Sequence, residues 1–90
     1  MKTDVSKAFE KMVFKIKEKE VKEALLKTIE RIIKAENLKQ IPKITPIVGH
    51  KDYYRIIVAD RYRLGIKYEN SIVWLLFFGL RNEKTYKSFP

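Results

Sequence analysis

The first 41 residues of this 90-residue chain contain neither glycine nor proline. An uninterrupted stretch of this length favours helix, because these two residues are the strongest helix breakers. At about 100° per residue, the apolar side chains form one stripe over residues 5–16 and another over residues 21–33. On a single straight helix these stripes would lie roughly 160° apart. A break near residues 17–20 removes this conflict and predicts an antiparallel helical hairpin over about residues 4–37; one long helix that feeds a dimer is the alternative.

Polar residues near both ends of this stretch suit helix termini. Thr3 or Asp4 is expected to cap the first helix, because a short side-chain oxygen accepts hydrogen bonds from the first backbone N–H groups. Asn37 is expected to end the second helix, with Pro42 soon after it.

The composition of the chain changes at residue 44, after which β-branched and aromatic residues predominate and short groups of turn residues separate them. The expected elements are a short strand or extended arm before Gly49 and strands over residues 53–58, 61–68 and 72–78. Consecutive strands with tight turns form an antiparallel meander, here over about residues 44–80. The last strand is apolar on both faces, which predicts an interior position in the sheet.

Helices followed by strands define the fold class as α+β. We expect one domain over residues 1–90, in which the N-terminal antiparallel helical hairpin packs on one face of a small, mainly antiparallel, twisted β-sheet. Residues 81–90 form a short polar C-terminal tail, with Tyr86 and Phe89 as its apolar anchors. Trp74, inside the apolar strand, is expected to pack in the core.

The chain is strongly basic, with 20 Lys and Arg against 11 Asp and Glu and a formal net charge of +9. Such an excess in a small domain is typical of a protein that binds nucleic acid or an acidic protein partner, although a lysine-rich solvated surface has the same composition. Four of the five arginines, Arg55, Arg61, Arg63 and Arg81, lie in the second half of the chain. Because a guanidinium group binds phosphate in a bidentate manner, we expect the phosphate-binding site in the second half of the chain.

Several classes of protein are excluded by what the sequence lacks. Without cysteine there is no disulfide scaffold or thiolate zinc site, and a lone His50 does not supply a metal site. No glycine-rich phosphate-binding motif is present. The longest apolar run is seven residues, against about 18–20 for a membrane helix, and no signal peptide opens the chain. We therefore expect a cytoplasmic protein without a membrane segment, a metal or another cofactor.

Short segments spread along the chain match one known family in order and spacing. The most specific are Tyr54-Arg55-Ile56 and, shortly after, Asp60-Arg61-Tyr62-Arg63-Leu64; Tyr86-Lys87-Ser88-Phe89-Pro90 and the shorter matches at residues 35–38, 41–42 and 49 follow the same pattern. In these features the chain resembles the RelE/ParE superfamily of toxin–antitoxin toxins. The resemblance implies a RelE-like toxin that cleaves mRNA on the ribosome and that a cognate acidic antitoxin neutralises in a toxin–antitoxin hetero-oligomer.

Three features depart from the family pattern. The family opens with an edge strand before the first helix, and here only residues 1–3 are available for one. The strand before Tyr54 lacks the lysines of RelE, which leaves the proton-accepting base unassigned. Near the C-terminus, Arg81 or Asn82 occupies the position of the family arginine, depending on the direction of counting.

Cleavage of RNA by its own 2′-OH requires a proton acceptor, positive charge on the phosphorane and a donor for the leaving 5′-oxygen, without a metal. Arg63 and Arg81 are the catalytic candidates for the charge, with a plain surface role as the alternative for each. Tyr86 is a candidate for base stacking or proton transfer, or else a packed anchor of the tail. RNA-positioning roles are expected for Arg55, Arg61, Lys51, Lys67 and His50, with Lys43 as a further phosphate contact.

Two of these expectations rest on local geometry. His50 lies beside Gly49 in a turn, where it is either a base or an exposed loop residue. Alternation along the strand over residues 61–68 gives it two unlike faces. One carries Arg61, Arg63 and Lys67, and the other carries Tyr62, Leu64, Ile66 and Tyr68. The charged face is expected to be the open one.

Three functions remain open at this point. The first is the ribosome-dependent endoribonuclease, and the second is the non-catalytic inhibition of DNA gyrase that the ParE branch of the superfamily performs. The third is a degenerate toxin whose remaining role is to bind its antitoxin and regulate its own synthesis.

Overall fold

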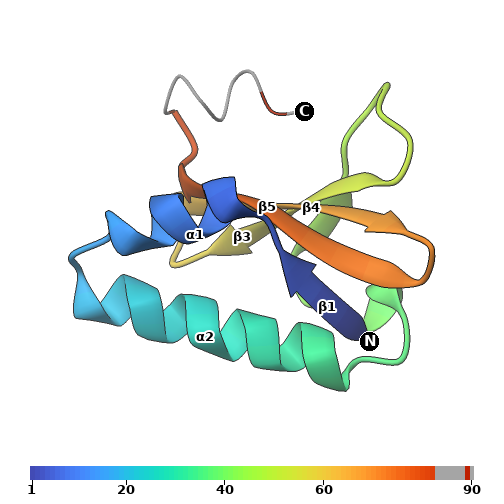
Figure 1. The fold of residues 1–90 in the computed structure, drawn as a ribbon, viewed down its shortest axis with the longest axis horizontal. Helices are drawn as coiled ribbons and strands as arrows, with labels where there is room; N and C mark the ends of the chain where they lie inside the picture. The colour runs from blue at the N-terminus through green and yellow to red at the C-terminus, as the bar shows by residue number, and fades with distance from the viewer. Residues whose placement is uncertain (83–88, 90) are drawn as a thin grey trace.

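The computed structural model describes residues 1–82 and residue 89 (Figure 1). In chain order its elements are β1 (Lys2–Val5), α1 (Lys7–Phe14), α2 (Lys19–Lys34), a 3₁₀ helix (Leu38–Gln40), β2 (Ile44–Pro46), β3 (Tyr53–Val58), β4 (Tyr62–Glu69) and β5 (Ile72–Leu80). The α+β class is as expected, with a short strand added at the start. Within the described residues, neither helix is long and apolar enough to cross a membrane.

The five strands form one mixed sheet in the order β1-β5-β4-β3-β2. β2 to β5 make the expected antiparallel meander, whereas β1 pairs with β5 in parallel, with Lys2 opposite Ile72 and Val5 opposite Leu75. β5 is therefore an interior strand, as predicted. The opening edge strand, for which the predicted helix left only residues 1–3, is present and runs to Val5, because the first helix begins later than predicted.

The start of α1 is set by Ser6, whose Oγ accepts a hydrogen bond from the backbone N–H of Phe9 at 3.0 Å. This cap satisfies one of the N–H groups that have no partner inside the helix. The prediction that Thr3 or Asp4 caps the helix is wrong, because both residues belong to β1. The predicted break between the two helices is found at residues 15–18.

The end of α2 is tied to the first strand. The helix stops at Lys34, earlier than the predicted end at Asn37. The amino group of Met1 donates hydrogen bonds to the carbonyl oxygens of Ile32 at 3.1 Å and Ala35 at 2.7 Å. Carbonyl groups in the last turn of a helix have no partner within it, so this contact holds β1 against α2.

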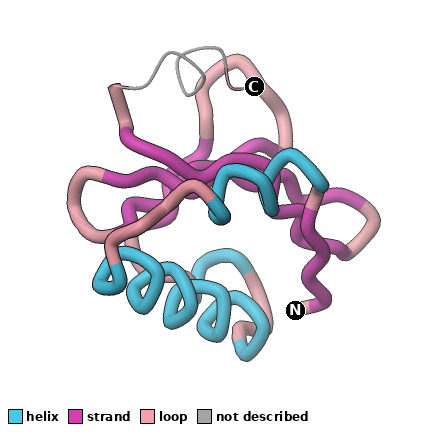
Figure 2. The backbone as a smooth tube through the Cα atoms, turned by 60° about the vertical axis from the view of Figure 1, so that its left-hand side comes forward, coloured by secondary structure: helices cyan, strands magenta, loops and turns pink. Residues whose placement is uncertain are grey.

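Both helices lie on one face of the sheet, as predicted, and each has its main contacts with strands (Figures 1 and 2). α1 packs mainly on β5, and α2 packs mainly on β3 and β1. The physical reason is that both apolar stripes are directed at the strands. Phe9 of α1 is buried with the core, whereas Phe14 at the end of the same helix is 88% exposed.

The core is a single cluster of buried side chains between the helices and the sheet. Its members are Phe9, Val21, Leu25, Ile32, Ala35, Ile41, Ile56, Val58, Tyr62, Leu64, Ile66, Val73, Leu75 and Phe78. The alternation predicted for β4 is found, because Tyr62, Leu64 and Ile66 are buried in this cluster. The hydroxyl of Tyr62 donates to the carboxylate of Glu18 at 2.9 Å, which satisfies the polar end of this side chain.

The connection between β4 and β5 is the two-residue turn Asn70-Ser71. Both residues have positive φ, 54° and 61°. This is the backbone of a type I′ turn, whose twist matches that of the two strands. The longer connection between β3 and β4 also contains two residues of positive φ, Ala59 and Asp60.

The phase of α2 is testable with two adjacent isoleucines. Ile32 is fully buried and Ile33 is 54% exposed. We expect Ile32→Ala to lower the free energy of unfolding by about 2–5 kcal/mol, because it leaves a cavity in the core. Ile33→Ala is the matched control and is expected to change it by less than about 1 kcal/mol. Urea unfolding followed by circular dichroism measures both; equal losses would mean that the helix is rotated from the described orientation.

Candidate nucleic-acid interface

The sheet has a second face, directed away from α1 and α2, which we call the open face. Strand alternation and register place Arg55 of β3, Arg63, Gly65 and Lys67 of β4, and Phe77 of β5 on it. Arg55 lies opposite Gly65, which in turn lies opposite Phe77, so these residues form one row across three strands. The charged face of β4 is therefore open, as predicted.

The arginine end of the open face lies where β4 begins and β5 ends. The backbone N–H of Arg81 donates to the carbonyl of Arg61 at 3.0 Å, so the two arginines are cross-strand neighbours although 20 residues separate them. They share a hollow of about 380 Å³, and the lining of this hollow is Asp60, Arg61, Leu80, Arg81 and Asn82. Arg81 and Asn82, between which the sequence did not choose, both line it.

Arg63 is attached to the same end. Its Nη1 donates to the carbonyl oxygens of Asp60 at 2.8 Å and Tyr62 at 2.9 Å. Arg63 lies opposite Gly79, two residues before Arg81, so alternation puts both arginines on the same face. These hydrogen bonds fix the Arg63 side chain beside the hollow that Asp60 lines. Three arginines therefore start from neighbouring backbone positions at one end of the face, and guanidinium groups are suited to phosphate.

The lysine end of the open face lies about 13 Å away, four residues further along β4. The Nζ of Lys67 lies 3.0 Å from the carboxylate of Glu69 and 5.2 Å from the centre of the Tyr53 ring. The hydrogen bond to Glu69 raises the pKa of the Lys67 ammonium above its ordinary value, and Tyr53 adds to this effect. Lys67 is therefore a permanent cation at neutral pH and does not suit the role of a base. His50 packs edge-on against the Tyr53 ring, with 6.3 Å between the ring centres.

Aromatic rings occupy the middle of the open face. Phe89 stacks on Phe77 with 5.9 Å between ring centres and 25° between ring planes. It also meets Tyr53 edge-on at 5.9 Å. Below the Phe89 ring lies Gly65, where a β-carbon would come within 2.6 Å of Phe89 Cζ. At such a distance either the ring or the strand would have to shift, so the ring of Phe89 lies in this position because residue 65 has no side chain.

The predicted site residues are only partly brought together. Arg61, Arg63 and Arg81 gather at the arginine end. Lys67 and His50, and with them the loop residue Lys51, belong to the other end, and Arg55 lies between the ends. Tyr86 lies outside the described residues. Lys43 lies on the helix side, where its backbone carbonyl accepts a hydrogen bond from Ile57.

Two aromatic positions differ from the sequence-based expectation. Trp74 is half-buried and is not part of the core cluster, because it lies opposite Lys67 and so faces the open side. Tyr53 and Phe77 were not recognised as part of a possible site, although Gly65 in the interior of a strand is a signal for close approach of another group.

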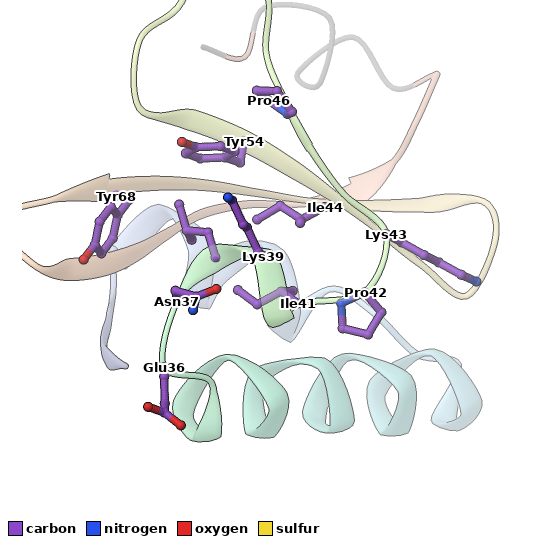
Figure 3. A pocket seen from close by; sticks show the side chains of 11 residues that line it. Glu36, Asn37, Lys39, Ile41, Pro42, Lys43, Ile44, Pro46, Tyr54 and Tyr68 are labelled. Atoms are coloured by element: carbon purple, nitrogen blue, oxygen red, sulfur yellow. The ribbon is translucent and has the colours of Figure 1, made fainter.

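A larger hollow than the one at the arginine end lies on the helix side of the sheet (Figure 3). It measures about 1010 Å³ and lies between the segment after α2, β2 and two tyrosines. Its lining residues are Glu36, Asn37, Leu38, Lys39, Ile41, Pro42, Lys43, Ile44, Pro46, Tyr54 and Tyr68. This lining is mainly apolar and has two lysines and one glutamate, which suits phosphate less well than the arginine end does.

The shift in the pKa of Lys67 gives a test of the lysine end. Replacing Glu69 by Gln removes the carboxylate that raises this pKa, so we expect it to fall toward the ordinary lysine value. Titration of the lysine side chains by heteronuclear NMR measures the change. Glu36→Gln, on the helix side, is the matched control and should leave the Lys67 titration unaltered. The same Lys67 pKa in both variants would contradict the Lys67–Glu69 pair.

Comparisons with known proteins place this geometry on a known fold. No protein-family model and no curated protein match the sequence. Among solved structures, the chain is similar to a chain of the crystal structure of the RelB–RelE antitoxin–toxin complex from Methanococcus jannaschii. The TM-score is 0.79 and the sequence identity is 24%, over 96% of this chain and 98% of that chain. The likeness is one of fold: this chain folds as a member of a RelB–RelE complex does.

Proposed function

We propose that the protein is the toxin of a toxin–antitoxin pair and that it cleaves mRNA bound to the ribosome. The observation that carries the proposal is the arginine end of the open face, where Arg61, Arg63 and Arg81 come from two strands to one site. The resemblance of the sequence to the RelE/ParE superfamily and the fold shared with a chain of a RelB–RelE complex support it independently.

The proposed reaction is attack of a ribose 2′-oxygen on the adjacent phosphorus, in which the P–O2′ bond forms as the P–O5′ bond breaks. The 2′-OH gives up a proton and the leaving 5′-oxygen takes one up, so the products are a 2′,3′-cyclic phosphate and a 5′-OH. Negative charge grows on the phosphorane oxygens during this step, and positioned guanidinium groups stabilise it. Arg63 and Arg81 take this role, and Arg61 positions the neighbouring phosphate. Because the two bonds of Nη1 hold Arg63 in place before RNA arrives, little reorganisation is needed at the moment of reaction. Tyr86 keeps its place as a candidate for stacking or proton transfer.

Two side chains fit the role of proton acceptor poorly. Lys67 is held charged by Glu69, and His50 lies with it at the lysine end. A linkage bound at the arginine end would be about 13 Å from that end of the sheet, judged by the rise along β4. In this scheme His50, Lys51, Lys67 and Arg55 bind the RNA backbone on the side of the linkage that faces the lysine end.

The proposed partners are mRNA on the ribosome and a cognate acidic antitoxin. The structural neighbour comes from an antitoxin–toxin complex, which supports an antitoxin for this chain. The net charge of +9 favours an acidic partner. This partner folds when it binds, and the two chains form a hetero-oligomer. Expression together with the neighbouring gene, followed by purification, would test this partner directly.

The catalytic proposal is tested by Arg63→Ala. We expect cleavage of a ribosome-bound mRNA to fall by about 10²-fold or more, because one group that stabilises transition-state charge is lost. Arg31→Ala on α2 is the matched control, since Arg31 is on the helix side. Primer extension on mRNA from a reconstituted translation reaction measures the cuts.

The outcome also separates the other two functions. Full cleavage by Arg63→Ala would contradict the proposed site. Growth arrest with intact mRNA and trapped gyrase–DNA complexes would identify a gyrase inhibitor instead. The absence of any growth defect on induction would indicate a degenerate toxin.

A further inference from the structure

The middle of the open face contains a slot the size of one flat ring, which we call the ring slot. Its floor is the backbone of Gly65, one wall is the face of Phe77, and a second wall is the ring of Tyr53. In this structure the ring in the slot is Phe89 of the same chain. Phe77 is only 1% exposed although it faces away from the helices, so the slot is a well-packed site.

A left-handed backbone does not explain the glycine at the floor of the slot. The φ of Gly65 lies outside that region, although the strand register is irregular between Gly65 and Ile66. Glycine in the interior of a strand is less stable than alanine there, because it loses more backbone freedom on folding. What Gly65 provides is room, because a methyl group there would collide with the ring above it. The residue thus keeps open a place where a flat ring can lie directly on the sheet.

Charges beside the slot are of the sign that a nucleotide requires. The ammonium group of Lys67 lies 5.2 Å from the centre of the Tyr53 ring that forms the second wall. Arg55 is the cross-strand neighbour of Gly65 itself. Within residues 1–82, the carboxylate that pairs with Lys67 is that of Glu69, two residues further along β4 from the slot. A ring that stacks in the slot therefore has cations within reach of an attached phosphate.

We propose that the ring slot is a binding site for one unpaired nucleobase and that Phe89 occupies it in place of the base until RNA binds. Phe89 and the base then compete for the same surface. The proposal rests on the proposed function for the identity of the ligand as RNA. The proposal adds to that function that one base of the RNA stacks between the arginine end and the lysine end. It also adds that Phe89 lowers the affinity of the protein for RNA.

If Phe89 competes with the base, removing its ring should raise the affinity for RNA. If Phe89 itself contacted the RNA, removing the ring would lower that affinity. When the binding-competent state is only partly populated, the apparent affinity falls by that fraction. Phe89→Ala empties the slot, so we expect a fluorescein-labelled hexaribonucleotide of mixed sequence to bind roughly 3- to 10-fold more tightly. Gly65→Ala fills the floor of the slot, so we expect binding about 5-fold or more weaker than that of the unaltered chain. Fluorescence anisotropy at fixed salt measures both.

The matched control for Phe89→Ala is Phe14→Ala, which removes an exposed phenylalanine on α1 and should leave the affinity unchanged. A second readout follows the slot directly. The ring of Phe89 above Gly65 should shift the α-proton resonances of this glycine upfield. We expect the shift to disappear in Phe89→Ala and to return when the hexaribonucleotide is added, because a stacked base takes the place of the ring.

Several results would overturn the proposal. Weaker binding by Phe89→Ala would make Phe89 part of the RNA surface, and unchanged binding by Gly65→Ala would mean that the slot is not used. If the upfield shift of the Gly65 α-protons does not return when RNA is added to Phe89→Ala, the slot is likewise not used by the base. The binding measurements do not depend on cleavage, so the two proposals can fail separately. If the mRNA is cut on the ribosome but neither variant changes the affinity, the ring-slot proposal is wrong and the nuclease proposal stands. If the affinities change as expected but no mRNA is cut, the nuclease proposal is wrong and the ring-slot proposal stands.

Discussion

The backbone pairing of β4 with β5 is the constraint on which the core and the open face both depend. Leu64 lies opposite Phe78 and Ile66 opposite Leu75, with an irregularity of register between them at Gly65. This irregularity allows Leu75 and Phe78, which are three residues apart, to face the helices together. A slip of one residue would exchange the two faces and bury Arg63 and Lys67. Since an unpaired buried cation costs several kcal/mol, the packing of the core also determines which cations reach solvent.

The same pairing accounts for the distribution of charge on the open face. Cross-strand pairing brings Arg81 to Arg61, and alternation adds Arg63 to them. Lys67 falls four residues further along, against Tyr53 and Glu69. Between the two groups lie the rings of Phe77 and Phe89, with Arg55 beside them. An extended polyanion with unpaired rings fits such an arrangement, because its phosphates and its bases find different partners along one line.

Much of this architecture was predictable, because it follows from local patterns. The break between the helices came from the phase of two apolar stripes, and the two faces of β4 came from simple alternation. What local patterns do not contain is the identity of a distant partner. β1 was missed because four residues of extended chain are recognised only by their pairing with β5. The antiparallel helical hairpin was expected on one face of the sheet because both helices are amphipathic, but amphipathicity does not say which strands each helix meets.

The candidate site residues divide in the same way. The sequence identified the arginines, because guanidinium chemistry is visible in composition and family resemblance. It did not identify Arg61 and Arg81 as neighbours, since that requires the register of strands that end far apart in the chain. Trp74 was assigned to the core from its apolar surroundings, but the irregularity in β5 turns it to the open side. The contact of Phe89 with Gly65 joins the end of the chain to the central strand and has no local signature beyond the glycine itself.

The turn at Asn70-Ser71 offers a way to make a more stable variant of this domain. Ser71 adopts a left-handed backbone, with φ of 61°, that costs an ordinary L-residue about 1–2 kcal/mol. Asn-Gly is the pair that such a reversal favours most. Glycine at position 71 would relieve the steric penalty without touching the interior or any cation of the sheet. Engineering for crystallisation or for spectroscopy can therefore begin at a site remote from the proposed chemistry.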